Sequence, residues 1–195
     1  MRPGLKAVYT PARISSQVAR LGQEISRTYR GGTVDVLVIL ESAFIFGADL
    51  VRHIAGPVIC HFVRNDVQDV QQGEYIRREI FFSLRPVLKG RDVLLVDTVL
   101  ETGVTTEFLL RRLWEGDPKS LRLAVLLDKP QERRVDVKPD YFGFVAASNY
   151  LVGYGLPGDD GSLRNLPYLA GSEKLDRERK AAQPVKRSRR RPGRK

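Results

Sequence analysis

The stretch from Asp92 to Leu113 constrains the fold more than any other part of the chain. It opens with a continuous apolar run, Val93 to Val96, which is typical of a strand buried on both faces of a sheet. From Thr106 onward the apolar residues have helical spacing. A polar loop with a glycine and several hydroxyl side chains lies between these two parts. The stretch therefore predicts a strand, a loop and a helix in direct succession.

The loop has the composition of an anion-binding site. Residues Thr102–Thr106 open the predicted helix, where free backbone N–H groups and the helix dipole attract negative charge. Gly103 allows a close approach of the backbone, and the threonine hydroxyls add hydrogen-bond donors. The alternative is an ordinary capped junction, with Thr106 as N-cap and Asp97 in solvent. The two acids on this loop, Asp97 and Glu101, favour binding of a phosphorylated sugar.

Apolar patterning predicts further strands and helices around this unit. Strands are predicted at Val36–Leu40, Pro57–Val63, Val93–Val96, Leu121–Leu127 and Tyr141–Val145, with a return strand at Glu79–Phe82. Helices are predicted over residues 13–30, 44–54 and 106–114, and an exposed loop over 64–73. Alternation of strands and helices indicates an α/β fold with a mainly parallel sheet, in which ligands bind beyond the carboxyl ends of the strands.

The positive charge of the chain is concentrated at one end. Of the formal net charge of +10, residues 173–195 contribute 11 Lys or Arg against 3 acidic residues. The chain as a whole is 42% hydrophobic and 29% charged, as in ordinary globular proteins. We expect one domain over residues 1–172 and a basic, disordered tail over residues 173–195.

The sequence favours a cytoplasmic location. Its single cysteine, Cys60, cannot form an internal disulfide, which suits a reducing compartment. The N-terminus has no apolar signal core. The most apolar run, Val36–Phe46, is interrupted by Glu41 and is too short to span a bilayer.

The loop of residues 97–106 resembles the phosphoribosyl pyrophosphate signature of type I phosphoribosyltransferases. Further segments are similar to the hypoxanthine-guanine branch of that family: Leu126-Leu-Asp-Lys-Pro130, Val135–Phe144, Asn149-Tyr-Leu-Val-Gly-Tyr-Gly155 and Arg164-Asn-Leu-Pro-Tyr168. The resemblance covers about residues 7–170, in the family's order and spacing. It implies the type I phosphoribosyltransferase fold: a mainly parallel central sheet flanked by helices, a small hood region and a flexible lid loop.

The resemblance also implies roles for single residues. Asp97 is expected to hydrogen-bond the ribose hydroxyls, and Glu101 to act as general base at the purine ring. Lys138 is expected to read the exocyclic oxygen of an oxopurine, and Tyr150 to stack on the base. A solvated lysine and a core tyrosine are the alternatives. The remaining phosphate and purine contacts are expected from Thr102, Gly103, Val104, Thr105, Thr106, Leu151 and Leu156.

Four features depart from the family pattern. Glu41-Ser42 replaces a Lys-Gly pair that binds pyrophosphate beside a non-proline cis peptide, and the acid pair at the ribose is reduced to Asp97-Thr98. Pro157 replaces a magnesium-binding Asp, and the lid segment Val63–Gln72 lacks a Ser-Tyr pair. Other residues that could serve these groups are Arg164 for pyrophosphate, and Asp97 (through a water), Asp159 or Asp160 for magnesium.

Three functions are compatible with this pattern. The first is purine salvage, in which ribose 5-phosphate passes from phosphoribosyl pyrophosphate to hypoxanthine or guanine, with magnesium as cofactor and with impaired catalysis. The second is a non-catalytic nucleotide-binding protein, such as a sensor or a partner subunit. The third and weakest is nucleic-acid binding through Lys186–Lys195. The family also implies a homo-oligomer, and the choice among oxopurines stays open.

Overall fold

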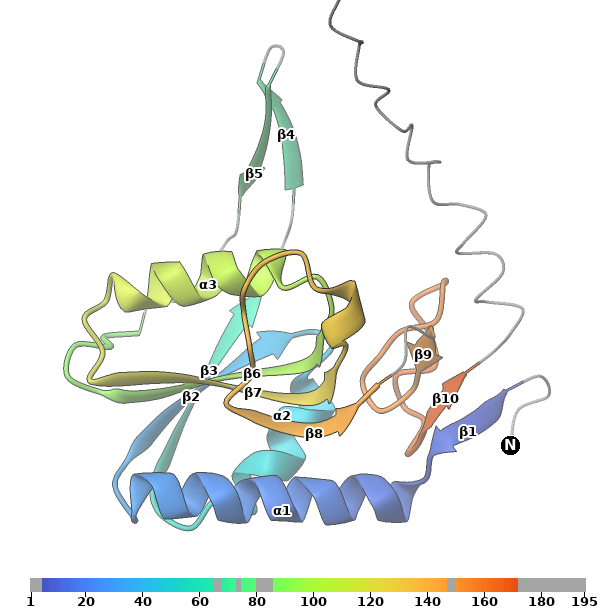
Figure 1. Cartoon of the computed structure of the whole chain (residues 1–195), viewed down its shortest axis with the longest axis horizontal. Helices are drawn as coiled ribbons and strands as arrows, with labels where there is room; N and C mark the ends of the chain where they lie inside the picture. Colours follow the sequence, from blue (N-terminus) through green and yellow to red (C-terminus); the bar gives the residue numbers. More distant parts are fainter. Residues whose placement is uncertain (1–4, 65–67, 73–74, 80–85, 147–149, 172–195) are drawn as a thin grey trace, which may run out of the picture.

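A five-stranded parallel sheet forms the centre of the computed structural model, which describes residues 5–64, 68–72, 75–79, 86–146 and 150–171. The strand order is β3-β2-β6-β7-β8, and all neighbouring strands are parallel. Helices lie on both faces of this sheet (Figure 1), which confirms the predicted α/β fold. The strands are β2 (Val34–Leu40), β3 (Val58–Arg64), β6 (Asp92–Leu100), β7 (Ser120–Asp128) and β8 (Tyr141–Val145). The helices are α1 (Pro11–Tyr29), α2 (Phe44–Val51) and α3 (Val104–Trp114).

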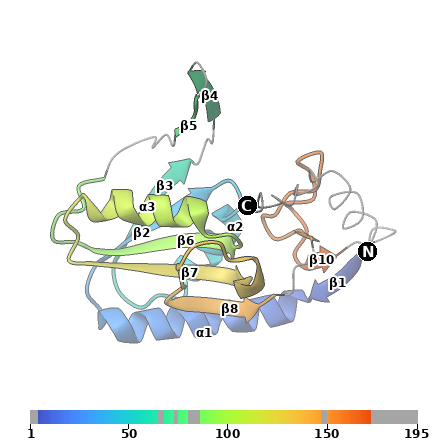
Figure 2. The same cartoon turned by 45° about the horizontal axis from the view of Figure 1, so that its top comes forward.

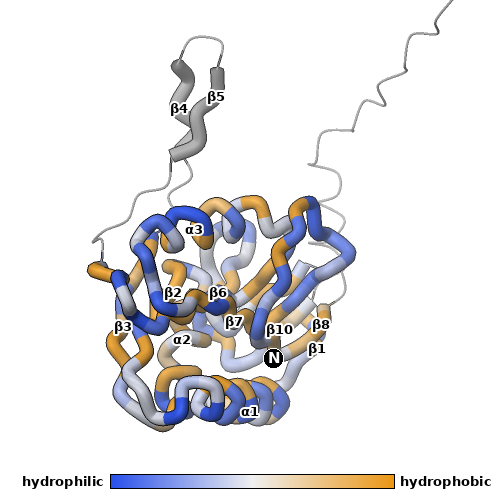
Figure 3. The backbone as a smooth tube through the Cα atoms, turned by 60° about the vertical axis from the view of Figure 1, so that its left-hand side comes forward, coloured by the Kyte–Doolittle hydropathy of each residue, from blue (hydrophilic) through white to orange (hydrophobic). Residues whose placement is uncertain are grey.

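The strands are apolar on both faces because each face of the sheet has its own core. In β2, Val36 and Val38 belong to the core beneath α1 and α2, whereas Leu37 and Ile39 belong to the core beneath α3. Successive side chains of a strand point to opposite faces, so a continuous apolar run fills both cores at once. By contrast, α1 alternates between apolar and hydrophilic residues (Figure 3), because only one side of it is buried.

The first helix begins where its sequence predicts. Thr10 is the N-cap, and its hydroxyl accepts a hydrogen bond from the Arg13 backbone N–H at 3.4 Å. Pro11 occupies the first turn, where its missing N–H costs nothing. The buried residues of α1 recur at helical spacing: Ile14, Val18, Leu21 and Ile25.

A second, smaller sheet joins the two ends of the described chain. It contains β1 (Lys6–Tyr9), β10 (Leu169–Gly171) and β9 (Leu151–Val152), all antiparallel, in the order β1-β10-β9. The carboxyl ends of β7 and β8 point toward this sheet (Figures 1 and 2). It corresponds to the expected hood region, and we use that name for it together with the loop of residues 153–168.

The prediction of an exposed loop over residues 64–73 is wrong in part. Arg64 ends β3, and Gln68–Gln72 forms β4, which pairs antiparallel with β5 (Tyr75–Glu79) in a hairpin that projects from the body on the side of α3. Polar residues are no obstacle to this pairing, because the backbone hydrogen bonds of a local hairpin do not require an apolar face. Of the predicted return strand, Glu79 ends β5, and residues 80–82 lie outside the described residues.

One boundary beside the loop of residues 101–103 also differs from the prediction. β6 continues past Val96 to Leu100, because Asp97 and Val99 still pair with β7 in register with Val125 and Leu127. The predicted tail, 173–195, lies outside the described residues. In the described part of the chain, none of the helices combines the length and the apolar character needed to cross a bilayer.

Candidate functional site

The predicted site residues gather at the carboxyl edge of the central sheet. Three loops meet there: residues 41–43 after β2, residues 101–103 after β6 and residues 129–135 after β7. The chain reverses at this edge after every parallel strand, so side chains from distant parts of the sequence converge.

A cavity of about 210 Å³ opens at the start of α3. Its walls come from the ends of β2 and β6, the loop after β6 and the first turns of α3: Ile39, Asp97, Val99, Glu101, Thr102, Gly103, Thr105, Thr106 and Leu109. Val104, also expected here, begins α3 but contributes no side chain to the walls; its N–H lies 3.5 Å from the Thr102 hydroxyl. The start of a helix and three threonine side chains thus surround this cavity, an arrangement that suits a phosphate.

Gly103 is the N-cap of α3, so the helix begins at Val104, two residues before the predicted start. It has φ +79, a left-handed conformation that favours glycine. A Cβ at this position would lie 3.0 Å from the Val135 side chain and 3.1 Å from Arg133 Cδ. The position therefore requires glycine both for its backbone and for the close approach of the loop after β7.

Arg133 was not among the predicted site residues, yet it holds this loop in place. Its Nη1 donates to the Glu101 carbonyl at 3.0 Å, and its Nη2 forms an ion pair with the Asp128 carboxylate. Both side chains of that pair are largely buried. The guanidinium thus connects the ends of β6 and β7.

Asp97 lines the same cavity at the start of α3. Its Oδ1 accepts hydrogen bonds from the Thr98 backbone N–H at 2.7 Å and from the Ser42 hydroxyl at 3.4 Å. Burial raises the pKa of the Asp97 carboxyl to about 6, and these hydrogen bonds oppose the shift only in part. The carboxylate is therefore ionised at neutral pH and able to accept hydrogen bonds from hydroxyl groups.

Thr98 does not share the cavity with Asp97. Its side chain is fully buried and donates to the Ser42 carbonyl at 2.8 Å. Neighbouring residues of a strand point in opposite directions, which explains why only one of the two faces the cavity. Thr98 fixes the loop after β2 instead.

A second cavity, of about 180 Å³, adjoins the first and shares Val99 and Glu101 with it. Its other walls are mainly apolar: Leu127, Lys129, Tyr150, Leu151, Leu156 and Pro157. Lys129 is 7% exposed, and its Nζ lies 3.2 Å from Glu101 Oε1. The Tyr150 hydroxyl donates to the Pro157 carbonyl at 3.0 Å. The cavity thus combines a flat aromatic side chain with an ammonium and a carboxylate, which suits a planar polar ring.

Lys138 does not reach this cavity. Its side chain is 87% exposed, and its ammonium lies 3.8 Å from the Asp136 carboxylate. It precedes β8 by three residues and so lies toward the amino edge of the sheet, whereas the cavities open at the carboxyl edge. Lys129, which follows β7 directly, lines this cavity instead. The signal for it was its position immediately after a buried strand.

Glu41 and Arg164 meet on the other side of Asp97. The peptide bond between Leu40 and Glu41 is cis, in the loop where such a bond was expected. Glu41 Oε2 lies 3.1 Å from Arg164 Nη2. Gly155, with φ +95, packs so closely on this loop that a Cβ would lie 2.2 Å from the Ser42 carbonyl oxygen.

The donor groups available to magnesium are few. Asp159 and Asp160 are exposed, and Asp160 Oδ1 accepts a hydrogen bond from the Ser162 backbone N–H at 2.9 Å. Among the described residues, no three His, Cys, Asp or Glu side chains gather in one place. Asp97 and Glu101 do line one cavity, and Mg²⁺ is commonly held by one or two carboxylates together with substrate phosphates. The residues therefore fit a magnesium ion that arrives with its ligand.

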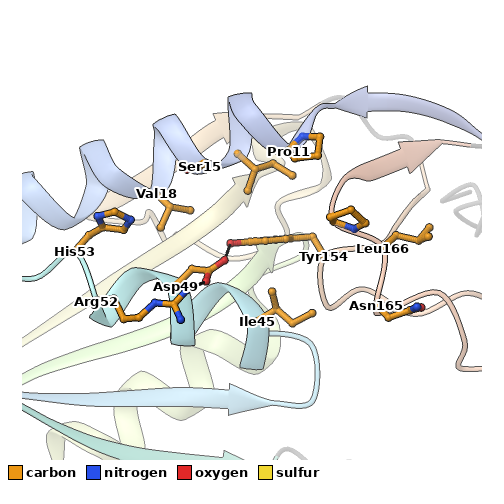
Figure 4. A pocket seen from close by; sticks show the side chains of 12 residues that line it. Pro11, Ser15, Val18, Ile45, Asp49, Arg52, His53, Tyr154, Asn165 and Leu166 are labelled. Carbon is orange, nitrogen blue, oxygen red and sulfur yellow. Dashed lines mark hydrogen bonds and ion pairs between the residues drawn. The ribbon is translucent and has the colours of Figure 1, made fainter. Parts of the chain in front are cut away.

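A further cavity, of about 410 Å³, lies on the opposite side of the hood, against α1 and α2 (Figure 4). Within it the Tyr154 hydroxyl donates to Asp49 at 2.5 Å, and Asp49 also pairs with Arg52. Burial, together with the Asp49 carboxylate, raises the pKa of Tyr154. The contact fastens the hood to α2, behind the site.

The fold and the anion-binding loop define a phosphoribosyltransferase of type I. Residues 5–157 match the phosphoribosyl transferase domain family, which is most of the described chain. The structure also aligns with a hypoxanthine phosphoribosyltransferase from Staphylococcus aureus at a TM-score of 0.80 and 26% identity, over 93% of this chain and 96% of that one. A hypoxanthine-guanine phosphoribosyltransferase from Bacillus anthracis aligns at a TM-score of 0.78 and 29% identity, over 86% and 98%.

Sequence relatives narrow the class. The chain is 32% identical over 168 residues to the hypoxanthine-guanine phosphoribosyltransferase of Lactococcus lactis, covering 84% of this chain and 88% of the relative. It is 32% identical over 178 residues to the hypoxanthine phosphoribosyltransferase of Salmonella typhimurium, covering 90% and 99%. The chain belongs to the hypoxanthine-guanine phosphoribosyltransferase family.

Proposed function

We propose that this chain binds the 5'-monophosphates of oxopurine nucleosides and catalyses the hypoxanthine-guanine phosphoribosyltransferase reaction at a low rate. The observation that carries the proposal is the pair of adjoining cavities, one suited to a phosphate and one to a purine, which share Val99 and Glu101. A nucleoside monophosphate has its phosphate and its base at opposite ends of a ribose, in the same arrangement.

Lys129 and Glu101 are the residues proposed to recognise the base. The Lys129 ammonium donates to the exocyclic oxygen of hypoxanthine or guanine, and the Glu101 carboxylate accepts an N–H of the purine ring. Adenine presents an amino group at the same place, which is a donor and cannot accept a hydrogen bond from the ammonium. The Tyr150 ring packs against the face of the base. This assignment replaces the one made for Lys138 from the sequence.

The proposed reaction uses these residues in a fixed order. The N-terminus of α3 holds the 5-phosphate, and Asp97 accepts hydrogen bonds from the ribose hydroxyls. A purine nitrogen forms the bond to the ribose C1 while the bond from C1 to the pyrophosphate oxygen breaks. Glu101 takes the proton that the purine ring releases. Magnesium, where bound, neutralises charge on the departing pyrophosphate.

The low rate follows from the groups around the leaving group. Glu41 places an anion near the departing pyrophosphate, and Pro157 has no carboxylate to offer a metal. Interactions that stabilise developing charge carry much of the catalysis in such reactions, so these losses reduce turnover more than binding. Arg164 is already bound to Glu41 and to the Gly155 carbonyl. This favours a second candidate function, that of a nucleotide-binding sensor or partner subunit.

One set of measurements tests both candidates. Hypoxanthine, guanine and xanthine are each incubated with phosphoribosyl pyrophosphate and magnesium, and nucleotide formation is followed; GMP and IMP binding is measured by calorimetry. We expect binding of GMP or IMP and turnover far below 10 per second, an ordinary enzyme rate. Turnover at that ordinary rate contradicts impaired catalysis, and the absence of binding heat at millimolar nucleotide contradicts the proposed function altogether.

A further inference from the structure

Glu41 and Arg164 form an ion pair between two loops that flank the cleft. Glu41 Oε2 lies 3.1 Å from Arg164 Nη2, and Arg164 Nη1 donates to the Gly155 carbonyl at 2.7 Å. The Glu41 side chain is 61% exposed and the Arg164 side chain 25% exposed. Both terminal nitrogens of the guanidinium are thus engaged by oxygens of this chain.

The loop that carries Glu41 is fixed to the ribose side of the site. The Thr98 hydroxyl donates to the Ser42 carbonyl at 2.8 Å, and the Ser42 hydroxyl lies 3.4 Å from Asp97 Oδ1. Gly155 packs directly on the same carbonyl. Because Ser42 is held from both sides, the backbone of the neighbouring Glu41 is fixed next to the residue that contacts Asp97.

We infer that Glu41 is a specificity-determining residue, which keeps Arg164 engaged and so disfavours ligands with a second anionic group at the ribose C1. The inference rests on the proposed function, because it uses the nucleotide orientation described there. With the phosphate at Thr102–Thr106 and the base beside Lys129, the ribose C1 lies on the side of Asp97 and Ser42.

Two kinds of ligand then meet different surroundings at this position. A ligand with pyrophosphate at C1 has to compete with Glu41 for Arg164, and it also faces a negative charge of like sign. A nucleoside monophosphate carries its base at C1 and no second anion, so the ion pair stays closed when it binds. The site therefore discriminates in favour of the monophosphate.

Calorimetry with inorganic pyrophosphate and with GMP tests this inference on the full chain. The variant Glu41→Gln removes the negative charge and keeps the size of the side chain. We expect it to bind pyrophosphate about tenfold more tightly than the unmodified protein, since one close like charge is removed. GMP affinity should stay within twofold. The gain should shrink between 0.05 and 0.5 M salt, because exposed charges are screened.

Two further variants make the result specific. Glu24→Gln removes another partly exposed glutamate of an ion pair, with Arg20 on α1 and away from the cleft, and should change neither affinity. Glu41→Gln combined with Arg164→Gln should lose the gain in pyrophosphate affinity, because the released guanidinium is what binds the anion. Thermal unfolding of each variant verifies that the hood remains folded.

The outcomes separate this inference from the proposed function. Pyrophosphate affinity of Glu41→Gln within twofold of the unmodified protein overturns the inference, whatever happens with GMP. If the double variant keeps the increase in pyrophosphate affinity, the inference is also overturned, because the increase then does not depend on Arg164. Absence of GMP binding in all proteins overturns the proposed function, whereas a gain for pyrophosphate that depends on Arg164 still supports the ion pair as a competitor.

Discussion

The two halves of the cleft are built differently. The phosphate–purine half (residues 97–106 with Lys129 and Tyr150) presents a helix start, hydroxyls and a buried ammonium to two cavities. The pyrophosphate half (Glu41, Ser42, Arg164 and Pro157) is tied together by contacts within the chain. The first half lines two cavities with its polar groups, whereas Glu41 and Arg164 of the second half are paired with each other.

The proposed function assigns binding and turnover to separate parts of this site. In that proposal a nucleoside monophosphate needs the first half, whereas departure of pyrophosphate needs the second. A chain can therefore preserve the nucleotide pocket while the groups around the leaving group change. The predictions below test whether the two halves are separable to this extent.

The largest effect is expected from Lys129→Met, which removes the ammonium and keeps an apolar stem of similar size. GMP affinity should fall about 100-fold, because a charged hydrogen bond in an apolar cavity is lost. The preference for GMP over AMP should fall with it. Calorimetry with both nucleotides measures the change. Lys138→Met is the matched control and should stay within twofold of the unmodified protein; equal losses in both variants would contradict the placement of the base beside Lys129.

Asp97→Asn should raise stability while it lowers nucleotide affinity. Burial raises the pKa of the Asp97 carboxyl to about 6, above 3.8 in the unfolded chain. The folded state thus favours the protonated carboxyl. Its contribution to the stability of the unmodified protein is fully present below pH 3.8 and is lost as pH rises through 6. At pH 8 the variant should be more stable by up to about 3 kcal/mol, and near pH 4 the gain should vanish.

Chemical denaturation at pH 4, 5, 6 and 8 measures that stability difference. Asp159→Asn, at an exposed position, is the control and should show no such dependence on pH. A gain that is independent of pH would contradict the assignment to the Asp97 carboxyl. A binding residue that destabilises the fold is common at functional sites, where local stability is exchanged for activity.

Much of the fold could be predicted from the sequence, because local patterns determine it. The apolar runs of β2, β6 and β7 predict strands buried on both faces, and Thr10, Pro11 and the spacing of Ile14 to Ile25 predict α1. The phosphate loop was predictable for the same reason, since its residues are contiguous. The β4–β5 hairpin was missed because its pairing leaves no apolar signature.

The rest of the site depends on contacts between distant residues. Glu41 and Arg164 are 123 positions apart, and no local pattern predicts that they pair. Thr98 faces the interior and Asp97 the cavity, a difference that follows from the pleat of a strand longer than predicted. Lys129, which lines the second cavity, was not predicted, because a similar motif pointed to Lys138; the role expected for Lys138 stays a prediction.

Restoring the pyrophosphate half should raise turnover by about tenfold or more. The combined variant Glu41→Lys, Ser42→Gly, Pro157→Asp introduces a cation, a more permissive backbone and a carboxylate for metal. Single changes should do little, because groups that serve one leaving group act as a unit. Steady-state rates with hypoxanthine and phosphoribosyl pyrophosphate measure the gain. GMP affinity within threefold of the unmodified protein serves as the control, and a large loss of it would show that the two halves are not separable.

The smallest effect is expected from Tyr154→Phe, which tests the support that the two halves share. Tyr154 lies between two glycines of the hood, and its hydroxyl donates to Asp49 on α2 (Figure 4). Gly155, the next residue, packs against Ser42 of the pyrophosphate half, and Leu156, which follows it, lines the purine cavity. Loss of one hydrogen bond should lower stability by about 1 kcal/mol, while Asp49 keeps its ion pair with Arg52.

Because the hood touches both halves, the small displacement that follows should weaken GMP and pyrophosphate binding by similar factors, about two- to threefold. Calorimetry with the two ligands and a thermal melt measure these changes. Arg52→Gln provides the comparison, since it removes the other partner of Asp49 and leaves the Tyr154 contact in place. A change for only one ligand would mean that the hood supports one half alone, and that the halves are separate in their scaffolding as well as in their chemistry.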